Sequence, residues 1–192
     1  MQQTKRFLDI VLSLTALALL SPALLFIAIR TLFSSKGAII YAQERVGQHG
    51  VPFIIYKFRS MYPDAEKNGP ALSFDGDARI TPWGKTMRKW KLDELPQLWN
   101  ILIGNMSLVG PRPERKYYID QLLQVAPQYS ELLKVKPGLT SLGMVQFGYA
   151  SNVPEMAARM QYDLEYLKRL SLGLDVRIML QTLRTILSGK GK

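Results

Sequence analysis

The stretch that decides the fold is Ile10–Ile29, IVLSLTALALLSPALLFIAI, which has twenty consecutive residues without a charge. An α-helix needs about 20 apolar residues to cross the hydrocarbon core of a bilayer. A signal peptide is the alternative, with Lys5 and Arg6 as its basic start. The apolar run is long for a signal peptide, however, and no small-residue cleavage site precedes Arg30. The sequence therefore predicts a membrane-inserted helix.

The path of this segment depends on its middle and its flanks. Ser21-Pro22 lies near the centre, where proline removes a backbone donor and clashes with the preceding turn. Basic residues flank the segment on both sides: Lys5, Arg6, Arg30 and Lys36. Because basic flanks stay in the cytoplasm, a helix that bends at Ser21-Pro22 and returns to the same face is favoured. A straight, proline-kinked span is the alternative. We expect Asp9 at the interface, since a carboxylate is costly deep in lipid.

The rest of the chain reads as one small domain. The 192 residues are 47% hydrophobic and 21% charged, which suits one compact domain beside the membrane element. We predict an α+β, mainly helical fold, with a re-entrant membrane helix-break-helix over 1–35 and a globular cytoplasmic part over 36–192. Two strands, 38–46 and 51–61, predict a hairpin around GQHG, with His49 as an ordinary surface residue. A polar loop at 62–78 precedes five predicted helices: 80–90, 94–103, 114–125, 153–170 and 172–187.

The last predicted helix is amphipathic. Its apolar side chains recur at helical spacing: Leu172, Val176, Met179, Leu180, Leu183 and Leu187. Such a helix packs on the core, or it lies in the membrane surface with its cations toward the headgroups: Arg177, Arg184 and Lys190. The sequence leaves both interpretations open.

Composition limits which partners and which metal ligands the chain can use. The net charge of +10 indicates an anionic partner but does not choose among nucleic acid, lipid headgroups and a phosphorylated substrate. The absence of cysteine excludes disulfides, Fe–S clusters and thiolate zinc sites. A single histidine, His49, argues against a histidine metal site or a Ser-His-Asp triad. A metal would therefore need oxygen ligands, which is typical of magnesium.

The densest group of chemically useful residues is KLDELPQLWNILIGNMSLVGPRPE, residues 91–114. Aspartate is a favoured helix N-cap and proline is tolerated in the first turn, so Asp93 is predicted to cap a helix that contains Pro96. Asp93 and Glu94 would then lie at the positive end of that helix, where anions also bind. A purely structural capping motif is the alternative.

Two nearby arginines strengthen the case for a catalytic role of Asp93 and Glu94. Arg88 lies five residues before Asp93, and Arg112 stands between two prolines that fix an extended backbone. Carboxylates with arginines nearby suit magnesium-assisted transfer of a phosphoryl group, in which one carboxylate attacks phosphorus or holds the metal. The guanidinium groups would neutralise the phosphoryl oxygens. A surface salt-bridge network fits the same residues.

Seven motifs in order carry a resemblance: KR…D…SP, QERVGQHG, YKFRSM, RITPWGKTMR, LDELPQLWNIL, GNMSLVGPRPE and KPGLTS. Together they resemble the bacterial sugar transferases, the monotopic polyprenyl-phosphate phosphoglycosyl transferases, over nearly the whole chain. The resemblance implies a membrane-bound catalytic domain on the cytoplasmic face of the bacterial inner membrane. It implies the first membrane step of exopolysaccharide, O-antigen or glycoprotein glycan assembly, with a UDP-sugar and polyprenyl (undecaprenyl) phosphate as substrates.

The resemblance also implies roles for individual residues. Asp93 would attack the β-phosphate of the UDP-sugar, release UMP and carry the phosphosugar until polyprenyl phosphate takes it, while Glu94, with Asp93, would hold Mg²⁺. Arg88 and Arg112 would hold phosphates. The membrane helix would break at the pair Ser21 and Pro22. The motif YKFRSM adds two further phosphate-binding candidates: Lys57 and Arg59.

One segment departs from the family pattern. Many members read Pro-Gly-Ile-Thr-Gly followed by Trp-Ala-Gln and Asn-Gly-Arg, whereas residues 137–149 here read PGLTSLGMVQFGY. Gln146 is kept, but the stretch has no arginine. The departure puts recognition of the nucleotide or the sugar in question and leaves the Asp-Glu pair untouched. The sequence specifies neither the sugar nor the oligomeric state.

Two rival interpretations have weaker support. Asp75-Gly76-Asp77 resembles the Asp-x-Asp metal pair of nucleotide-sugar glycosyltransferases, but it lies in a polar loop without alternating parallel strands and helices. A membrane-tethered, non-catalytic protein that binds anionic lipid or nucleic acid would use the net charge of +10. No basic run or aromatic RNA-binding motif supports it, so we expect no nucleic-acid partner.

Overall fold

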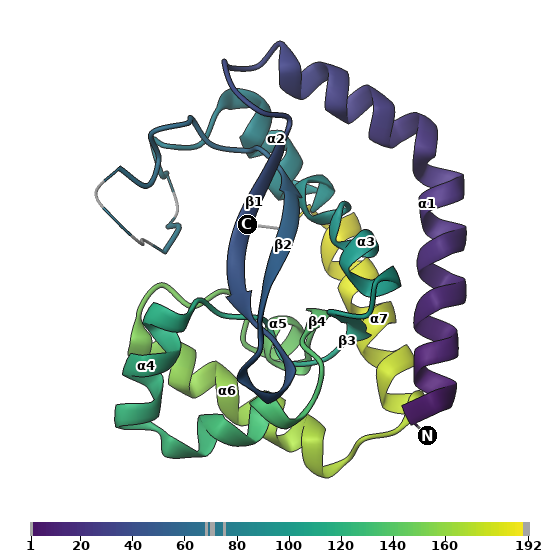
Figure 1. Ribbon diagram of the computed structural model, residues 1–192, viewed down its shortest axis with the longest axis vertical. Coiled ribbons are helices and arrows are strands. Elements are labelled where there is room, and N and C mark those ends of the chain that lie inside the picture. Colours follow the sequence, from purple (N-terminus) through teal and green to yellow (C-terminus); the bar gives the residue numbers. More distant parts are fainter. Residues whose placement is uncertain (1, 68, 70–71, 75, 190–192) are drawn as a thin grey trace.

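The apolar segment folds into one long helix, α1 (Gln2–Leu32), along one side of the molecule in the computed structural model (Figure 1). The structure describes residues 2–67, 69, 72–74 and 76–189. The helix continues through Ser21-Pro22, and Figure 1 shows its ribbon changing direction midway. The Ser21 hydroxyl donates to the Ala18 carbonyl (2.8 Å). The predicted break at Ser21 and Pro22 is therefore wrong: the proline bends a continuous helix, as a missing backbone donor does.

A β-hairpin stands at the centre and helices surround it (Figure 1). Strand β1 (Ile40–Val46) pairs antiparallel with β2 (Pro52–Phe58), and the short β3 (Ser107–Val109) pairs parallel with β4 (Gly138–Thr140). Six helices follow α1 in the described residues: α2 (Pro82–Lys89), α3 (Gln97–Leu102), α4 (Lys116–Val125), α5 (Leu142–Gln146), α6 (Val153–Lys168) and α7 (Leu172–Leu187). Tight 3-10 turns complete the fold: η1 (Gln48–Gly50), η2 (Leu92–Glu94) and η3 (Pro127–Lys134). The predicted α+β, mainly helical class is confirmed.

The α1 helix is covered by protein on one narrow face. Ala16 and Leu17 pack on a buried cluster that contains Ile55 and Ile101, while Ile27 is buried near the other end of the helix. The most apolar 18-residue window has a mean hydropathy of 2.5, yet only 11% of it is buried. A core helix of a soluble protein is mostly buried, so α1 presents its apolar side chains outward.

The start of α1 is fastened to the rest of the chain by polar contacts. Asp9 is buried and accepts a hydrogen bond from the Leu108 amide (2.9 Å). Arg6 donates to the last two carbonyls of α3, at 2.5 and 2.7 Å, and so caps that helix. Lys5 pairs with Asp175 at 2.5 Å. Protein thus covers the Asp9 carboxylate, with β3 as its partner, and its place at the membrane interface stays a prediction.

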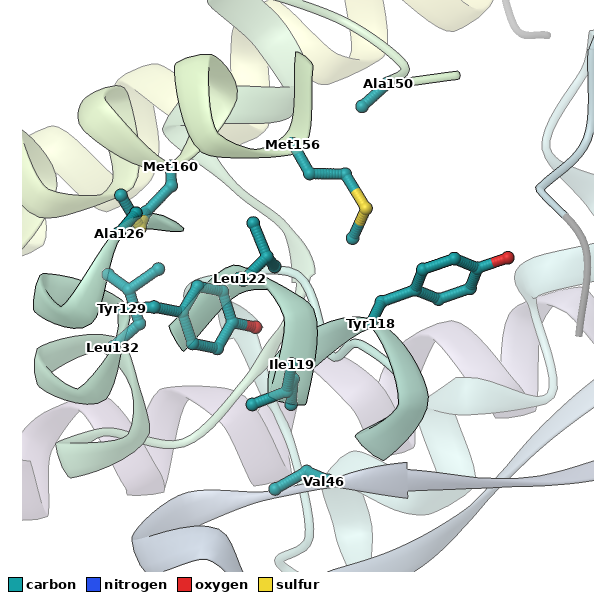
Figure 2. Close-up of a cluster of buried hydrophobic side chains, with 10 residues drawn as sticks. All are labelled: Val46, Tyr118, Ile119, Leu122, Ala126, Tyr129, Leu132, Ala150, Met156 and Met160. Atoms are coloured by element: carbon teal, nitrogen blue, oxygen red, sulfur yellow. The ribbon is translucent and has the colours of Figure 1, made fainter. Parts of the chain in front are cut away.

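The largest buried cluster joins α4, η3 and α6 to the end of β1 (Figure 2). Its members come from segments that are distant in the sequence: Val46, Tyr118, Ile119, Leu122, Ala126, Tyr129, Leu132, Ala150, Met156 and Met160. The loop between α5 and α6 packs on this part of the core, because its Ala150 is a member of the cluster.

The α7 helix uses two faces. Ile178 is fully buried against Val109 and Tyr166, whereas a neighbouring stripe is 49–76% exposed: Val176, Leu180, Leu183 and Leu187. The sequence left open whether this helix packs on the core or lies in a membrane surface. The structure packs one face and leaves an apolar stripe uncovered among the described residues. Lys190 lies outside the described residues.

Candidate active site

The predicted site residues meet at one large cavity of about 1030 Å³. Its lining includes all six predicted catalytic and phosphate-binding residues: Lys57, Arg59, Arg88, Asp93, Glu94 and Arg112. They come from β2 and the residue after it, from α2, from η2 and from the loop after β3. Ser21 and Pro22 are exposed on α1 and lie outside this lining. Tertiary structure thus gathers side chains that are up to 55 residues apart in the sequence (Lys57 to Arg112).

The Asp-Glu pair lies in a tight turn between α2 and α3. Thr81 caps α2 by accepting from the Gly84 amide (2.9 Å), and Trp90 ends that helix. Asp93 and Glu94 then form the 3-10 turn η2. The prediction that Asp93 caps the following helix is wrong, because α3 begins only at Gln97 and makes no side-chain cap. The predicted helix 94–103 is shorter for the same reason.

Glu94 is surrounded by positive charge. Lys57 Nζ lies 2.9 Å and Arg112 3.6 Å from Glu94 Oε1, and Lys91 Nζ lies 4.0 Å from Oε2. Burial by itself would raise the pKa of Glu94, but the charges of Lys57, Lys91 and Arg112 outweigh it and hold this pKa well below its usual range. Glu94 is therefore a fixed negative charge that organises three cations.

Asp93 has the opposite environment. It is 5% exposed, and its Oδ1 has no hydrogen-bond partner within the described part of the chain. Burial, followed by the charge of Glu94, raises the pKa of Asp93. Buried polar atoms are nearly always paired, so an unpaired carboxylate oxygen on a residue that lines the cavity calls for a ligand or a reacting atom.

The carboxylates fit a partial magnesium site. Magnesium is commonly held by one or two carboxylates and by substrate phosphates. Across residues 2–67, 69, 72–74 and 76–189 no group of three or more acidic or histidine ligands occurs, but the unpaired Asp93 Oδ1 beside Glu94 supplies the smaller set. For the rival Asp-x-Asp motif, Asp75 lies outside the described residues. Asp77 is buried and engaged by Arg79 at 2.6 Å.

The predicted arginines take different roles. Arg88 is held by two hydroxyls, since its Nε donates to Ser60 and its Nη1 to Ser73, each at 2.9 Å. Hydroxyl partners leave its positive charge available to an anion. Arg59 is buried and donates to carbonyls at and beyond the end of α1: Thr31, Ser35 and Ala38. This geometry closes the end of α1. Arg59 Nε has no hydrogen-bond partner within the described part of the chain, so a phosphate contact of Arg59 stays a prediction.

Arg112 is presented by two distant motifs that meet in the β3–β4 pair. The Gly110 amide donates to Thr140 (3.0 Å), and the Gly138 amide donates to Pro111 (2.8 Å). A Cβ at Gly138 would lie 2.1 Å from the Gly110 nitrogen, so only glycine permits this approach. The motifs GPRP and KPGLT are therefore parts of one loop support.

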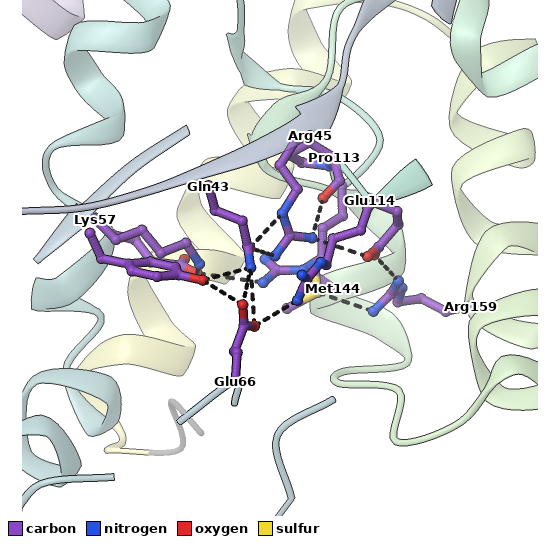
Figure 3. Close-up of polar contacts among 12 residues, drawn as sticks. Gln43, Arg45, Lys57, Glu66, Pro113, Glu114, Met144 and Arg159 are labelled. Carbon is purple, nitrogen blue, oxygen red and sulfur yellow. Dashed lines mark hydrogen bonds and ion pairs between the residues drawn. The ribbon is translucent and has the colours of Figure 1, made fainter. Parts of the chain in front are cut away.

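A second group of cavity-lining residues, around Glu114, forms a paired network that the sequence did not indicate (Figure 3). Arg159 lies 2.6 Å from Glu114 Oε1, and Arg45 lies 3.4 Å from Oε2. All three side chains are at most 14% exposed. Figure 3 shows Gln43 and Glu66 beside them, where Gln43 Nε2 donates to Glu66 Oε1 at 3.2 Å. The spacing in sequence gives no signal for these contacts.

Two further lining residues were missed. Lys91 stands directly before the turn, and burial lowers its pKa to about 8. Tyr149 enters from the altered segment 139–150. Gln146, which that segment keeps, is exposed at the end of α5 and does not belong to the lining.

Comparison with known proteins agrees with this arrangement. The sequence model of the bacterial sugar transferase family matches residues 1–189. The chain therefore belongs to the bacterial sugar transferase family, as the motifs predicted.

Several relatives are long proteins of which this chain matches one part. It is 42% identical over 187 residues to a UDP-N-acetylgalactosamine-undecaprenyl-phosphate N-acetylgalactosaminephosphotransferase of Aeromonas hydrophila, covering 97% of this chain and 44% of that protein. It is 39% identical to a UDP-glucose:undecaprenyl-phosphate glucose-1-phosphate transferase of Klebsiella pneumoniae, covering 93% and 39%. With the exopolysaccharide production protein PSS of Rhizobium leguminosarum bv. phaseoli the identity is 37%, and each chain is covered to 97%. The chain thus spans less than half of the first two relatives.

Proposed function

We propose that this chain transfers a sugar 1-phosphate from a UDP-sugar to polyprenyl (undecaprenyl) phosphate, yielding polyprenyl-diphosphate-sugar and UMP. The observation that carries the proposal is the unpaired, buried Asp93 Oδ1 beside Glu94 and its cations. Family membership and the names of the relatives support the same class of donor and acceptor.

The proposed chemistry has two displacements at phosphorus. Asp93 Oδ1 attacks the β-phosphorus, the bond from this phosphorus to the bridging oxygen breaks, and UMP leaves with that electron pair. An oxygen of polyprenyl phosphate then attacks the aspartyl phosphosugar and frees the carboxylate. Arg88 and Arg112, with Lys57, hold the phosphoryl oxygens. When bound, Mg²⁺ supplies further neutralisation of these oxygens, and Glu94 with Asp93 would hold it.

We place the reaction at a membrane surface. The exposed apolar side chains of α1 and the uncovered stripe of α7 would both enter lipid. In this proposal residues 1–35 are a re-entrant helix bent at Ser21-Pro22, and 36–192 are a catalytic domain on the cytoplasmic face of the inner membrane. The product would begin the assembly of an exopolysaccharide, O-antigen or glycoprotein glycan.

Turnover can be tested directly. The detergent-solubilised chain, incubated with Mg²⁺, polyprenyl phosphate and a panel of UDP-sugars, should release UMP with one or a few sugars. Without the acceptor, intact-protein mass spectrometry should find a phosphosugar adduct that the Asp93→Asn variant lacks. A non-catalytic, membrane-tethered binding protein would release no UMP with any sugar, and that result would reject the proposal.

The topology has its own test. The chain has no cysteine, so Gln2→Cys and Lys36→Cys each introduce a single label site, one at either end of α1. In sealed inverted vesicles both sites should react with a membrane-impermeant maleimide. If one site reacts only after the vesicles are opened, α1 spans the membrane and the re-entrant proposal is wrong.

A further inference from the structure

Lys91 holds an unusual backbone conformation at the mouth of the Asp-Glu turn. Its φ of 56° and ψ of 23° are left-handed, a region that favours glycine over a lysine. Strained residues of this kind concentrate at functional sites, where surrounding contacts hold them. Its ammonium lies 4.0 Å from Glu94 Oε2, so the strained backbone delivers a third cation to Glu94.

Tyr149, from the loop after α5, contacts this cation. Gly148, with a φ of 94°, turns the chain after α5. Ala150, the residue after Tyr149, is buried in the main hydrophobic cluster. Between them, the Tyr149 ring centre lies 4.0 Å from Lys91 Nζ and 5.5 Å from Arg112 Cζ. Both distances suit cation–π attraction. One ring therefore contacts two of the three cations around Glu94.

Two cations that converge on one carboxylate repel each other. Glu94 supplies one negative charge, while Lys57 also draws on it at 2.9 Å. An aromatic face attracts cations without adding a formal charge. The Tyr149 ring can thus hold Lys91 and Arg112 at the cavity wall, and both side chains keep their positive charge for a phosphate.

We propose that Tyr149 is a positioning residue of the donor site, whose ring holds the Lys91 ammonium and the Arg112 guanidinium together so that both face the donor diphosphate. The inference rests on the proposed function and deepens it, because it names how the altered segment 139–150 takes part. Lys91 and Arg112 contact the diphosphate, and Tyr149 acts through them.

Binding of UDP, measured by calorimetry on the detergent-solubilised chain, tests the inference. Tyr149→Leu should weaken binding about tenfold, whereas Tyr149→Phe keeps the ring and should stay close to wild type. Lys91→Asn removes the cation while asparagine tolerates the left-handed backbone. Because Tyr149 acts partly through Lys91, Tyr149→Leu should cost clearly less in the Lys91→Asn background than in wild type. Phe147→Leu is the matched control, since Phe147 lies in the same loop, packs on Tyr162 and is absent from the cavity lining.

The outcomes separate the explanations. If Tyr149→Leu weakens UDP binding as much in the Lys91→Asn background as in wild type, the ring contacts UDP directly. If Tyr149→Leu binds UDP as tightly as wild type, the ring has no role. Either result overturns the inference. Should Tyr149→Leu unfold, Tyr149→Met replaces it at similar volume. UDP binding needs no turnover, so a chain that releases no UMP rejects the proposed function while the binding cycle still decides the role of Tyr149.

Discussion

Two groups of cavity-lining residues, the paired end around Glu114 and the Asp93 end with Glu94, are built from the same residue types but differ in how their charges are paired. At one end Glu114 has an arginine on each carboxylate oxygen, Arg159 at 2.6 Å and Arg45 at 3.4 Å. At the other end Glu94 takes the cations, and Asp93 keeps an oxygen without a partner among the described residues. Both ends are buried, so burial alone does not separate them.

We infer from this difference that the paired end stabilises the fold and that the Asp93 end carries the proposed reaction. A buried unpaired polar group costs on the order of 1–3 kcal/mol, and a fold tolerates that cost where the group is needed for chemistry. The paired end should therefore govern stability, and the Asp93 end should govern transfer.

The largest expected effect is the loss of transfer in Asp93→Asn. Removing a nucleophile lowers turnover by at least about 1000-fold, while stability at pH 7 should stay equal or rise because a charge leaves a crowded, buried site. UMP release and thermal unfolding measure the two effects. A variant that loses stability but keeps its rate would reverse the comparison.

At the paired end, Arg159→Met should leave Glu114 partly unpaired and lower the free energy of unfolding by about 3 kcal/mol. The matched control is Arg169→Met, which breaks an exposed pair with Glu165 (3.0 Å) and should cost at most about 1 kcal/mol. Chemical denaturation of both variants checks this. Equal losses would show that burial of the network does not matter.

Asp163 extends the paired end and makes it sensitive to pH. Burial raises the pKa of Asp163 from 3.8 to about 6, although its carboxylate accepts from the Gly143 amide at 2.8 Å. The folded state then binds this proton more tightly than the unfolded state. Stability from this group is present below pH 4 and is lost as pH rises toward 6, by up to about 3 kcal/mol.

Asp163→Asn should therefore flatten the pH dependence of unfolding between pH 4 and 6. The comparison is with wild type in the same buffers, with the slope of the unfolding free energy as the readout. An unchanged slope in the variant would assign that pH dependence to other carboxylates.

The smallest expected effect concerns the support of Arg88. Ser73→Ala and Ser60→Ala each remove one 2.9 Å hydrogen bond to its guanidinium. A hydrogen bond to a charged group is worth about 1.5–3 kcal/mol, but the other serine still holds the guanidinium, so each variant should lower the rate of UMP release by about tenfold or less. Larger losses would mean that a serine contacts the substrate itself.

Local patterns predicted the elements that depend on neighbouring residues. The run Ile10–Ile29 predicted α1, two strand-like segments around GQHG predicted the hairpin, and the segment 80–90 predicted α2, since each reflects contacts between neighbouring residues. The motif around Asp93 also predicted residues that line the cavity. The helix cap at Asp93 failed because a left-handed Lys91 and a 3-10 turn, set by the packing of α2 and α3, replaced it.

The sequence alone predicted the long apolar helix, the hairpin, the longer helices and the family, because these depend on composition and on short ordered motifs. Tertiary structure decided which buried charges pair across the cavity. It brought Arg159 to Glu114 across 45 residues, placed Tyr149 over Lys91 and left Asp93 Oδ1 unpaired. Side-chain pairing depends on distances in space, and no spacing along the chain encodes those distances.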